Sequence, residues 1–300
     1  MKIKHIHFII NPASGAEAPI LTDINKVFCE SGITWDVSIT KKDGDAYKFA
    51  SAFKGKTDIV AVYGGDGSLT EVAGALYGSR TPMAIIPGGT ANVTAKELNI
   101  PLSSVDALEL LKGSKSKVIK IDMGMANGEP FLIRINLGIM ADMIIRADRE
   151  LKDSMGQLAY GITAIKSIAQ MDPVSYILQI DGKEFKENAV ALTVTNAGSL
   201  GIGTMSLLPG ISIKDGLLDV ILLNDASIMS VLSIAGTTLL QNDSDILKHW
   251  RCKEVEISSD KLMPYIHDDV QKRAKKLHLK VMPGALKILV PASFKKQTLF

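Results

Sequence analysis

Short apolar runs recur along the first third of the chain, and segments with helical spacing separate them. The runs at 3–10, 58–63 and 83–86 have the lengths and composition of buried strands. Residues 33–40 instead alternate between apolar and polar, as a half-buried strand does. Apolar positions three and four apart predict helices at 19–31, 45–53, 69–76, 91–98 and 104–112. Strands that alternate with helices predict a parallel, doubly wound α/β sheet.

From about residue 119 the pattern changes to strands joined by tight turns. Asn127-Gly128 follows 119–125 and precedes 131–137, and Asp181-Gly182 lies between 175–180 and 189–195, so two hairpins are expected. Further strands are predicted at 217–223, 253–258, 277–282 and 286–290, with apolar helices at 155–171 and 227–240. Mostly antiparallel strands predict a β-rich second domain, a sandwich or an open barrel.

The resulting prediction is an α/β domain at 1–118 and a β-sandwich domain at 119–290, with the tail 291–300 returning to the first domain. A chain of 300 residues is long enough for two such domains. The net charge of +2 does not indicate a strongly basic surface that would bind nucleic acid. With only Cys29 and Cys252, no disulfide framework is expected, which fits a reducing cytoplasm. No apolar run is long enough to span a membrane.

The stretch 58–76 carries the first candidate chemistry. An apolar strand ends there in Gly64-Gly65-Asp66-Gly67, and glycines let a ligand approach the backbone closely. Ser68 followed by Glu71 has the spacing of a capping box at the start of a helix. Free N–H groups at a helix N-terminus favour phosphate, and Asp66 adds a carboxylate. A tight turn with a solvated aspartate explains the same residues, and neither GxxxxGK[ST] nor GxGxxG is present.

The positions of other polar residues favour the nucleotide interpretation. Ligands of open α/β sheets bind beyond the carboxyl ends of the strands. Asn11, Gly64 and Thr90 follow predicted strands directly or closely, and Thr40 ends one. We therefore expect a nucleotide site at this edge of the sheet.

Four motifs in fixed order resemble one known family. They are Asn11-Pro12-Ala13-Ser14-Gly15, Gly64-Gly65-Asp66-Gly67, Pro87-Gly88-Gly89-Thr90-Ala91-Asn92 and Lys214-Asp215-Gly216-Leu217-Leu218-Asp219. Together they resemble the diacylglycerol kinase catalytic-domain family, which includes soluble bacterial lipid kinases, sphingosine kinases and ceramide kinases. GGDG alone also occurs in the related NAD kinases and phosphofructokinases. The resemblance spans nearly the whole chain and implies a nucleotide domain, a β-sandwich domain and an active cleft between them.

The resemblance also implies functional residues. ATP would contact residues of the glycine loop and of the strand ends, namely Asn11, Pro12, Ala13, Ser14, Gly15, Thr40, Gly64, Gly65, Asp66, Gly67, Ser68, Leu69, Thr70, Gly89, Thr90 and Asn92. A structural Mg²⁺ would be held by the Asp215 carboxylate and by oxygens of Ser212 and Leu217, which are the hard ligands that this ion prefers. Without the resemblance, an ordinary β-turn explains the presence of Ser212, Asp215 and Leu217.

The chain departs from the family where a proton acceptor is expected. The family's Asp-Gly-Glu is here Asp268-Asp269-Val270, and valine cannot accept a proton. Asp268, Asp269 and Asp66 are the candidate catalytic carboxylates, with Asp268 favoured because it matches the one retained residue of the triplet. Two lesser departures are Thr70 in place of the family's Asn and Val93 in place of its Asp.

The implied activity is ATP- and Mg²⁺-dependent transfer of a phosphoryl group to a lipid hydroxyl. The alternatives are a weak or inactive nucleotide- or lipid-binding homologue, supported by Val270, and a small-molecule kinase of the NAD kinase type. The expected partner is a lipid substrate at a membrane surface, visited transiently from the cytoplasm, with no nucleic acid; homodimerisation is left open. Lys272, Arg273, Lys275, Lys276 and Lys280 form a basic run that suits an anionic membrane or a solvated hairpin.

Overall fold

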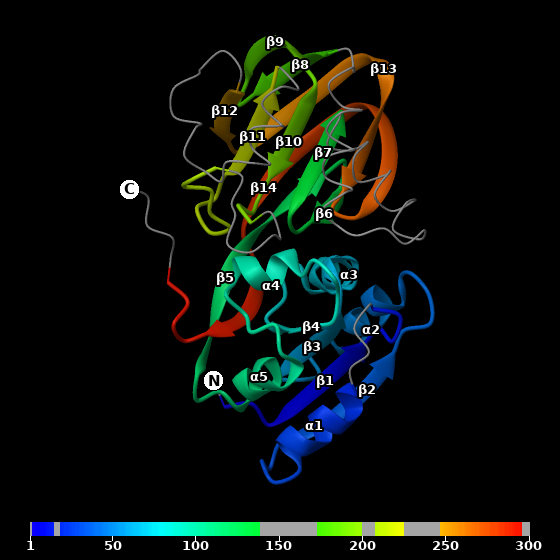
Figure 1. The fold of residues 1–300 in the computed structure, drawn as a ribbon, viewed down its shortest axis with the longest axis vertical. Helices are drawn as coiled ribbons and strands as arrows, with labels where there is room; N and C mark the ends of the chain where they lie inside the picture. Colours follow the sequence, from blue (N-terminus) through cyan, green and yellow to red (C-terminus); the bar gives the residue numbers. More distant parts are fainter. Residues whose placement is uncertain (1, 15–18, 139–172, 200–207, 225–246, 296–300) are drawn as a thin grey trace, which may run out of the picture. The chain divides into compact units, whose positions relative to one another are not determined.

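A computed structural model describes residues 2–14, 19–138, 173–199, 208–224 and 247–295 (Figure 1). The chain divides into two compact units. The first comprises residues 1–123, 197–216 and 282–300, and the second comprises residues 124–196 and 217–281. Three stretches that the sequence assigns to the second domain, 119–123, 197–216 and 282–290, thus belong to the first unit. The helices expected at 155–171 and 227–240, and Gly15, lie outside the described residues.

The first unit contains a parallel sheet with helices on both faces. Its strands lie in the order β2-β1-β3-β4, and the C-terminal part of β14 pairs beside β4. Right-handed crossovers place α1 and α5 on one face and α2 and α3 on the other (Figure 1). The elements are β1 (His5–Ile10), α1 (Ile20–Phe28), β2 (Thr34–Ile39), α2 (Asp45–Phe53), β3 (Ile59–Gly64), α3 (Asp66–Leu76), β4 (Met83–Pro87), α4 (Val93–Glu97), α5 (Ser104–Glu109) and the 3₁₀ helix η1 (Leu110–Lys112).

Burial follows the predicted pattern in this unit. Every residue of β3 and β4 is buried, as their uninterrupted apolar runs predict. The strand β2 lies at the edge of the sheet, so its residues are exposed or half-buried. The doubly wound α/β prediction for this part of the chain is confirmed.

The predicted capping box at Ser68 and Glu71 is wrong. Helix α3 begins at Asp66 with Gly65 at its N-cap, so both residues lie inside the helix. The Glu71 carboxylate instead accepts hydrogen bonds from the backbone N–H groups of Gly44 (3.0 Å) and Tyr47 (3.2 Å). Glu71 therefore caps the N-terminus of α2, the neighbouring helix, because a capping pattern in sequence does not say which helix end a carboxylate meets.

The second unit is built of antiparallel strands. One run of strands lies in the order β12-β11-β10-β7-β13, and β13 also pairs with β8 and with β14. Its core consists of buried side chains such as Leu178, Val194, Val220 and Leu279. The elements are β6 (Glu129–Phe131), β7 (Arg134–Gly138), β8 (Val174–Ile180), β9 (Lys183–Ala189), β10 (Ala191–Thr195), β11 (Leu218–Leu223), β12 (Leu247–Cys252) and β13 (Glu254–His267), while β5 (Ser116–Ala126) and β14 (Val270–Pro291) have residues in both units.

Two strand predictions in the second half of the chain need correction. The hairpin at Asp181-Gly182 joins β8 to β9, whereas 191–195 forms the separate strand β10 between β7 and β11. The charged run 183–189 was missed because its side chains are mostly exposed. The predicted strands 277–282 and 286–290 are one strand, β14, which continues through Pro283-Gly284. The turn at Asn127-Gly128 is confirmed, with β5 paired to β6.

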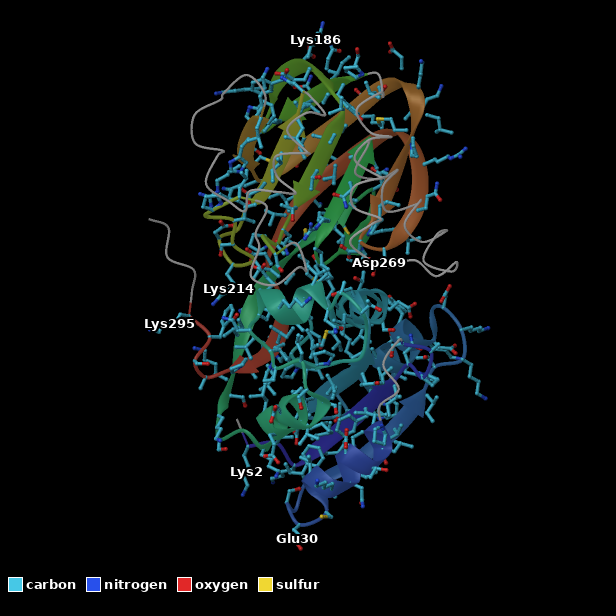
Figure 2. The ribbon with its side chains drawn as sticks, in the orientation of Figure 1. Lys2, Glu30, Lys186, Lys214, Asp269 and Lys295 are labelled. Atoms are coloured by element: carbon cyan, nitrogen blue, oxygen red, sulfur yellow. The ribbon has the colours of Figure 1, made fainter. Side chains whose placement is uncertain are left out.

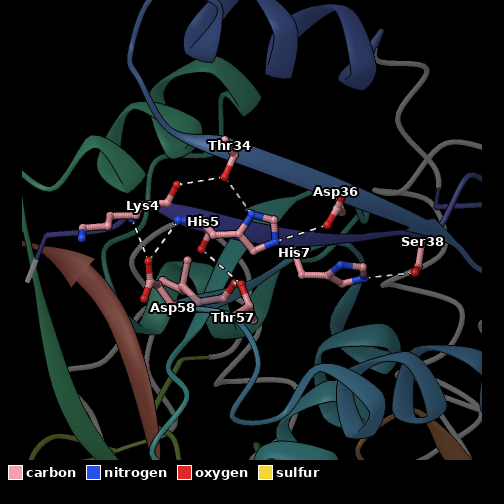
Figure 3. A network of polar contacts seen from close by, with 9 residues as sticks. Lys4, His5, His7, Thr34, Asp36, Ser38, Thr57 and Asp58 are labelled. Atoms are coloured by element: carbon pink, nitrogen blue, oxygen red, sulfur yellow. Dashed lines mark hydrogen bonds and ion pairs between the residues drawn. The ribbon is translucent and has the colours of Figure 1, made fainter.

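A network of polar residues runs along β1 and β2, and His7 is its buried member (Figure 3). The His7 ring is 1% exposed and stacks on Phe53 at 3.4 Å between ring centroids. Its Nε2 lies 3.0 Å from the Ser38 hydroxyl, and its Nδ1 is buried without a partner. Burial lowers the pKa of His7 from 6.5 to about 4, although Asp36 opposes part of this effect. His7 is therefore neutral near neutral pH.

We expect His7 to make the protein less stable in acid. The unfolded chain binds a proton at His7 below pH 6.5, whereas the folded chain binds one only below a pH of about 4. Stability should therefore fall as the pH drops through this window, by up to about 3 kcal/mol in total. Urea unfolding at a series of pH values should show a shallower dependence for His7→Gln than for the wild type. Equal pH dependences of the two proteins would contradict this role.

No helix among the described residues is long and apolar enough to cross a membrane.

Candidate active site

The predicted nucleotide residues meet at the carboxyl edge of the first unit's sheet. The register pairs Ile10 with both Ile39 and Tyr63, and Gly64 with Pro87, so the strands β1 to β4 end at the same level. The segments that begin at Asn11, Thr40, Gly64 and Gly88 therefore lie at one edge. Thr40 is 9% exposed, and its backbone N–H and its hydroxyl both donate to the Ile10 carbonyl.

The two glycine-rich loops pack directly against each other. A Cβ at Gly89 would lie 2.6 Å from the Gly65 Cα, and a Cβ at Gly88 would lie 2.9 Å from the Tyr63 ring. A Cβ at Gly64 would meet Ser68 Cβ at 2.8 Å. Close packing thus explains three of these glycines. Gly65 is different, because its nearest neighbour would be the Gly89 Cα at an ordinary contact distance of 3.4 Å.

Gly65 also lies at the N-terminus of a helix, where backbone N–H groups can donate to a ligand. It is the N-cap of α3, with extended backbone angles (φ −88°, ψ 179°) that any residue can adopt. The N–H groups of the first turn of a helix have no acceptor within the helix, and the helix dipole adds positive potential there. Neither backbone strain nor a clash requires glycine at 65. Open access to the first turn of α3 is the remaining physical reason for a glycine at this position.

The motif that begins at Asn11 holds its own loop against α3. The Asn11 amide donates to the Ser68 hydroxyl (3.0 Å), and its side-chain oxygen accepts from the Ala13 N–H (3.0 Å). The Ser14 hydroxyl donates to the Asn11 carbonyl (2.7 Å). Asn11, Ser14 and Ser68 are half-buried, Pro12 and Ala13 are exposed, and Leu69 is fully buried. The Leu69 N–H donates to the Gly65 carbonyl (3.2 Å), so Leu69 packs inside the fold and does not face a ligand.

The Asp66 carboxylate binds the N-terminus of helix α4. It accepts hydrogen bonds from the N–H groups of Val93 (2.9 Å) and Thr94 (3.0 Å) and from the Thr94 hydroxyl (2.9 Å). Asp66 is 7% exposed. Asn92 precedes this helix in a left-handed conformation (φ 49°) and bonds Gly89 in both directions. Asp66 thereby joins the loop after β3 to the loop after β4, and its contacts are those of a residue that positions both loops.

Asp122, which was not predicted from the sequence, holds the loop that carries the predicted metal ligands. Asp122, 3% exposed, accepts hydrogen bonds from the Gly216 N–H (2.7 Å) and the Gly284 N–H (2.7 Å). Its own N–H donates to the Ile213 carbonyl (2.8 Å). A lone aspartate inside the apolar run of β5 was the available signal, because buried carboxylates need partners. Asp122 thus fixes both sides of the turn that contains Asp215.

The donors of this loop suit a hard cation. Asp215 and Ser212 are half-buried, and so is Leu217. One carboxylate with backbone or hydroxyl oxygens is a donor set that Mg²⁺ accepts, with water completing its shell. Among the described residues, no group of three or more His, Cys, Asp and Glu side chains converges on one point. A metal at this loop would therefore rely on Asp215 and on backbone oxygens.

Asp268 and Asp269 form the turn between β13 and β14, and Val270 is the first residue of β14. The Asp268 carboxylate accepts hydrogen bonds from the N–H groups of Leu132, Ile133 and Arg134, at 2.8 to 2.9 Å. Asp268 is 6% exposed, with φ 50°. These contacts explain why the predicted strand 131–137 is interrupted at 132–133. Asp269 is exposed at the same turn (Figure 2), and Val270 is 55% exposed.

The comparisons with known proteins agree with both units. Residues 5–126 match the family model of the diacylglycerol kinase catalytic domain. Residues 134–290 match that of the YegS C-terminal NAD kinase beta sandwich-like domain. The chain is 31% identical over 268 residues to a Pseudomonas putida protein named "Probable lipid kinase YegS-like", with 88% of each chain covered. It is 28% identical over 246 residues to a Bacillus subtilis diacylglycerol kinase, with 79% of each covered.

A solved structure shows the same fold. A diacylglycerol kinase from Bacillus anthracis superposes with a TM-score of 0.76 at 21% identity, covering 98% of this chain and 100% of the other. The α/β domain and the β-sandwich domain predicted from the sequence are therefore both confirmed. With both family models matched in order along the chain, this protein belongs to the lipid kinase family of diacylglycerol kinase and YegS-like proteins.

Proposed function

We propose that the protein is an ATP- and Mg²⁺-dependent kinase that phosphorylates a lipid hydroxyl. The observation that carries this proposal is the open N-terminus of α3 at Gly65, between two loops in which packing explains Gly64, Gly88 and Gly89. Phosphate is the ligand that such a helix terminus favours. The lipid substrate follows from the family and from the names of its relatives in Bacillus subtilis and Pseudomonas putida.

The residues at the strand ends would bind and orient ATP. The N–H groups of the first turn of α3 would donate to its phosphates, and the small side chains of Ser14, Ser68 and Thr90 leave room beside them. Asp66 would keep the loops after β3 and β4 at a fixed spacing through its bonds to Val93 and Thr94. Phosphoryl transfer depends chiefly on such positioning and on charge stabilisation.

Asp269 is the proton acceptor that we propose for the lipid hydroxyl. The Asp268 carboxylate is buried and accepts three backbone hydrogen bonds, which makes it a positioning residue for the turn. Asp269 is exposed and adjoins Val270, which replaces the family's glutamate. This assignment replaces the preference for Asp268 that the sequence alone suggests.

Mg²⁺ would bind at the Asp215 loop and contribute to stability there. A ligand that binds only the folded state stabilises it by mass action. Adding Mg²⁺ should raise the melting temperature of the wild type, and Asp215→Ala should remove this increment. The control is Asp106→Ala, which alters a carboxylate in the first turn of α5 and should leave the Mg²⁺ increment intact. Equal Mg²⁺ increments in the wild type and Asp215→Ala would contradict the assignment.

A transient visit to an anionic membrane is part of the proposal. Within the basic run, Lys272 pairs with Glu129 and Lys276 with Glu256, while Arg273 and Lys275 are exposed. Exposed basic residues contribute about 1 kcal/mol each near an anionic surface. The paired lysines contribute less, because their charges are already partly compensated.

The proposed function is tested by incubating the protein with γ-labelled ATP, Mg²⁺ and a total lipid extract. A labelled phospholipid is the expected product. Label in a water-soluble acceptor, such as NAD, would instead indicate the small-molecule alternative. Absence of any labelled product would indicate a homologue without catalysis.

A further inference from the structure

The strands β9, β8, β13 and β14 turn one face to the core of the second unit and the other face outward. Core residues such as Leu178 lie on the inner face. The register pairs Ile177 with Lys186 on one side and with Ser258 on the other, and Ser258 in turn pairs with Lys276. Directly opposite residues of antiparallel strands project to the same face, and successive residues of a strand alternate between faces. The outer face therefore carries a row in which an isoleucine lies between lysines.

A second apolar side chain projects from this face where the pairing of β13 with β14 becomes irregular. Met263 belongs to the core, so its neighbour Leu262 points outward, and Leu262 is 53% exposed. Pro264 lies opposite Arg273 and continues the outer face. Ile177 is 39% exposed. We refer to the exposed apolar and basic side chains of this face as the outer patch, which consists of Ile177, Leu262, Lys186, Arg273, Lys275 and Lys276.

Positive charge surrounds the two apolar side chains of the outer patch. Arg273 and Lys275 are exposed, and neither pairs with a carboxylate in the described part of the chain. Lys276 and Lys186 each pair with a glutamate, but their side chains remain 61% and 75% exposed. The adjacent residues 260–261, an aspartate and a lysine, add no net charge. The outer patch is thus apolar at two positions and positively charged around them.

An anionic membrane is the partner that fits this pattern. Basic side chains are attracted to the phosphates of anionic lipids, and exposed apolar side chains beside them gain free energy by entering the acyl region. Protein interfaces instead have few lysines and bury a contiguous apolar centre. In the outer patch, Ile177 and Leu262 stand singly among long basic side chains. The charge and the apolar contacts therefore favour a lipid surface over a protein.

We propose that the outer patch docks the protein on an anionic lipid bilayer. Leu262 and Ile177 enter the acyl region, and Arg273 and Lys275 bind phosphates of the headgroups. Asp269 lies in the turn of the same β13–β14 hairpin, so docking brings the proposed proton acceptor to the surface that holds its substrate. This inference rests on the proposed lipid kinase function, and it assigns the surface and the apolar contacts through which the membrane is bound.

The test measures sedimentation with phosphatidylcholine vesicles that contain or lack phosphatidylglycerol, without ATP. The wild type should bind the phosphatidylglycerol vesicles more strongly. Leu262→Asp should weaken that binding about tenfold or more, because an apolar contact is lost and a negative charge is added. Arg273→Ser combined with Lys275→Ser should weaken it about tenfold as well. The matched control is Leu102→Asp, which alters a leucine of the first unit that is 52% exposed, and it should bind like the wild type.

Insertion is measured separately with a tryptophan at each of the two leucine positions. Acyl chains that carry bromine quench a tryptophan that reaches them. Leu262→Trp should be quenched on vesicles of brominated phosphatidylglycerol beyond the background of Trp35 and Trp250, which the wild type gives. Leu102→Trp should show the background alone. This measurement does not depend on a loss of binding.

Two outcomes overturn the proposal. One is equal wild-type binding to the two kinds of vesicle. The other is wild-type binding by a folded Leu262→Asp protein together with background quenching in Leu262→Trp, which would leave the outer patch to a protein partner or to solvent. Transfer of label from ATP to short-chain diacylglycerol without vesicles reports on the kinase proposal separately. Labelling with unaltered vesicle binding in Leu262→Asp overturns this inference alone, whereas vesicle binding that is lost in Leu262→Asp supports it even where no lipid is labelled and the kinase proposal fails.

Discussion

Replacing Gly65 with valine is expected to weaken ATP binding by about a hundredfold or more while leaving the fold intact. The backbone angles at Gly65 suit any residue, and its first added atom would meet only the Gly89 Cα at 3.4 Å. The valine methyl groups would instead occupy the space in front of the first turn of α3. Loss of even two hydrogen bonds from backbone N–H groups to charged phosphate accounts for this factor. Calorimetric titration with ATP measures the effect.

Gly89→Ala is the matched control, because it separates packing from ligand access. The added Cβ would lie 2.6 Å from the Gly65 Cα, so the two loops would have to move apart. This variant should lose stability in thermal unfolding, whereas Gly65→Val should unfold near the wild-type temperature. Unchanged ATP affinity in Gly65→Val would remove the physical basis of the nucleotide site.

Asp269→Asn is expected to lower the turnover number for lipid phosphorylation by about 10²–10⁴-fold, the usual contribution of a general base. The amide cannot accept the hydroxyl proton, but it has nearly the same size as the carboxylate. Binding of lipid and ATP should change little, so the effect should appear in kcat and not in KM. Steady-state kinetics with labelled ATP measures both constants.

Two further variants at the same turn distinguish the alternatives. Asp268→Asn should mainly reduce stability, by about 2 kcal/mol, because a buried charged acceptor of three N–H groups is lost. Val270→Glu should change turnover little if Asp269 is the base. A large gain in Val270→Glu, together with full activity in Asp269→Asn, would show instead that the base position is empty in the wild type and that the protein is a weak kinase. Val270→Gln controls for side-chain size in that comparison.

The elements of the first unit follow closely from the sequence. Buried parallel strands such as β3 and β4 are short apolar runs, and glycine-rich turns mark their ends, so both strands and their common edge are predictable. The capping role of Glu71 is not predictable, because Glu71 caps a different helix. Its partners Gly44 and Tyr47, at the start of α2, lie 27 and 24 residues earlier in the chain. Asp122 was missed for a similar reason, since its partners Gly216 and Gly284 are far along the chain.

The strands of the second unit are harder to predict from the sequence, because apolar and polar residues alternate along them or their side chains are exposed. The strand β9 carries a charged sequence and is recognised only by its pairing with β8. The motif Asp-Asp-Val at 268–270 suggested Asp268 as the base, but the sequence does not show that this carboxylate is engaged by the backbone of 132–134. The row from Lys186 to Lys276 likewise requires the register of β9, β8, β13 and β14.

The most direct test of the proposed lipid kinase activity is transfer of the γ-phosphoryl group of ATP to diacylglycerol in vesicles with Mg²⁺. The wild type should form labelled phosphatidic acid, and Gly65→Val should form almost none. A reaction that contains both NAD and the vesicles lets the enzyme phosphorylate either a small-molecule acceptor or a lipid acceptor. Label in the lipid that disappears in Gly65→Val is the predicted result, and label in NAD alone, or in neither acceptor, would contradict the account.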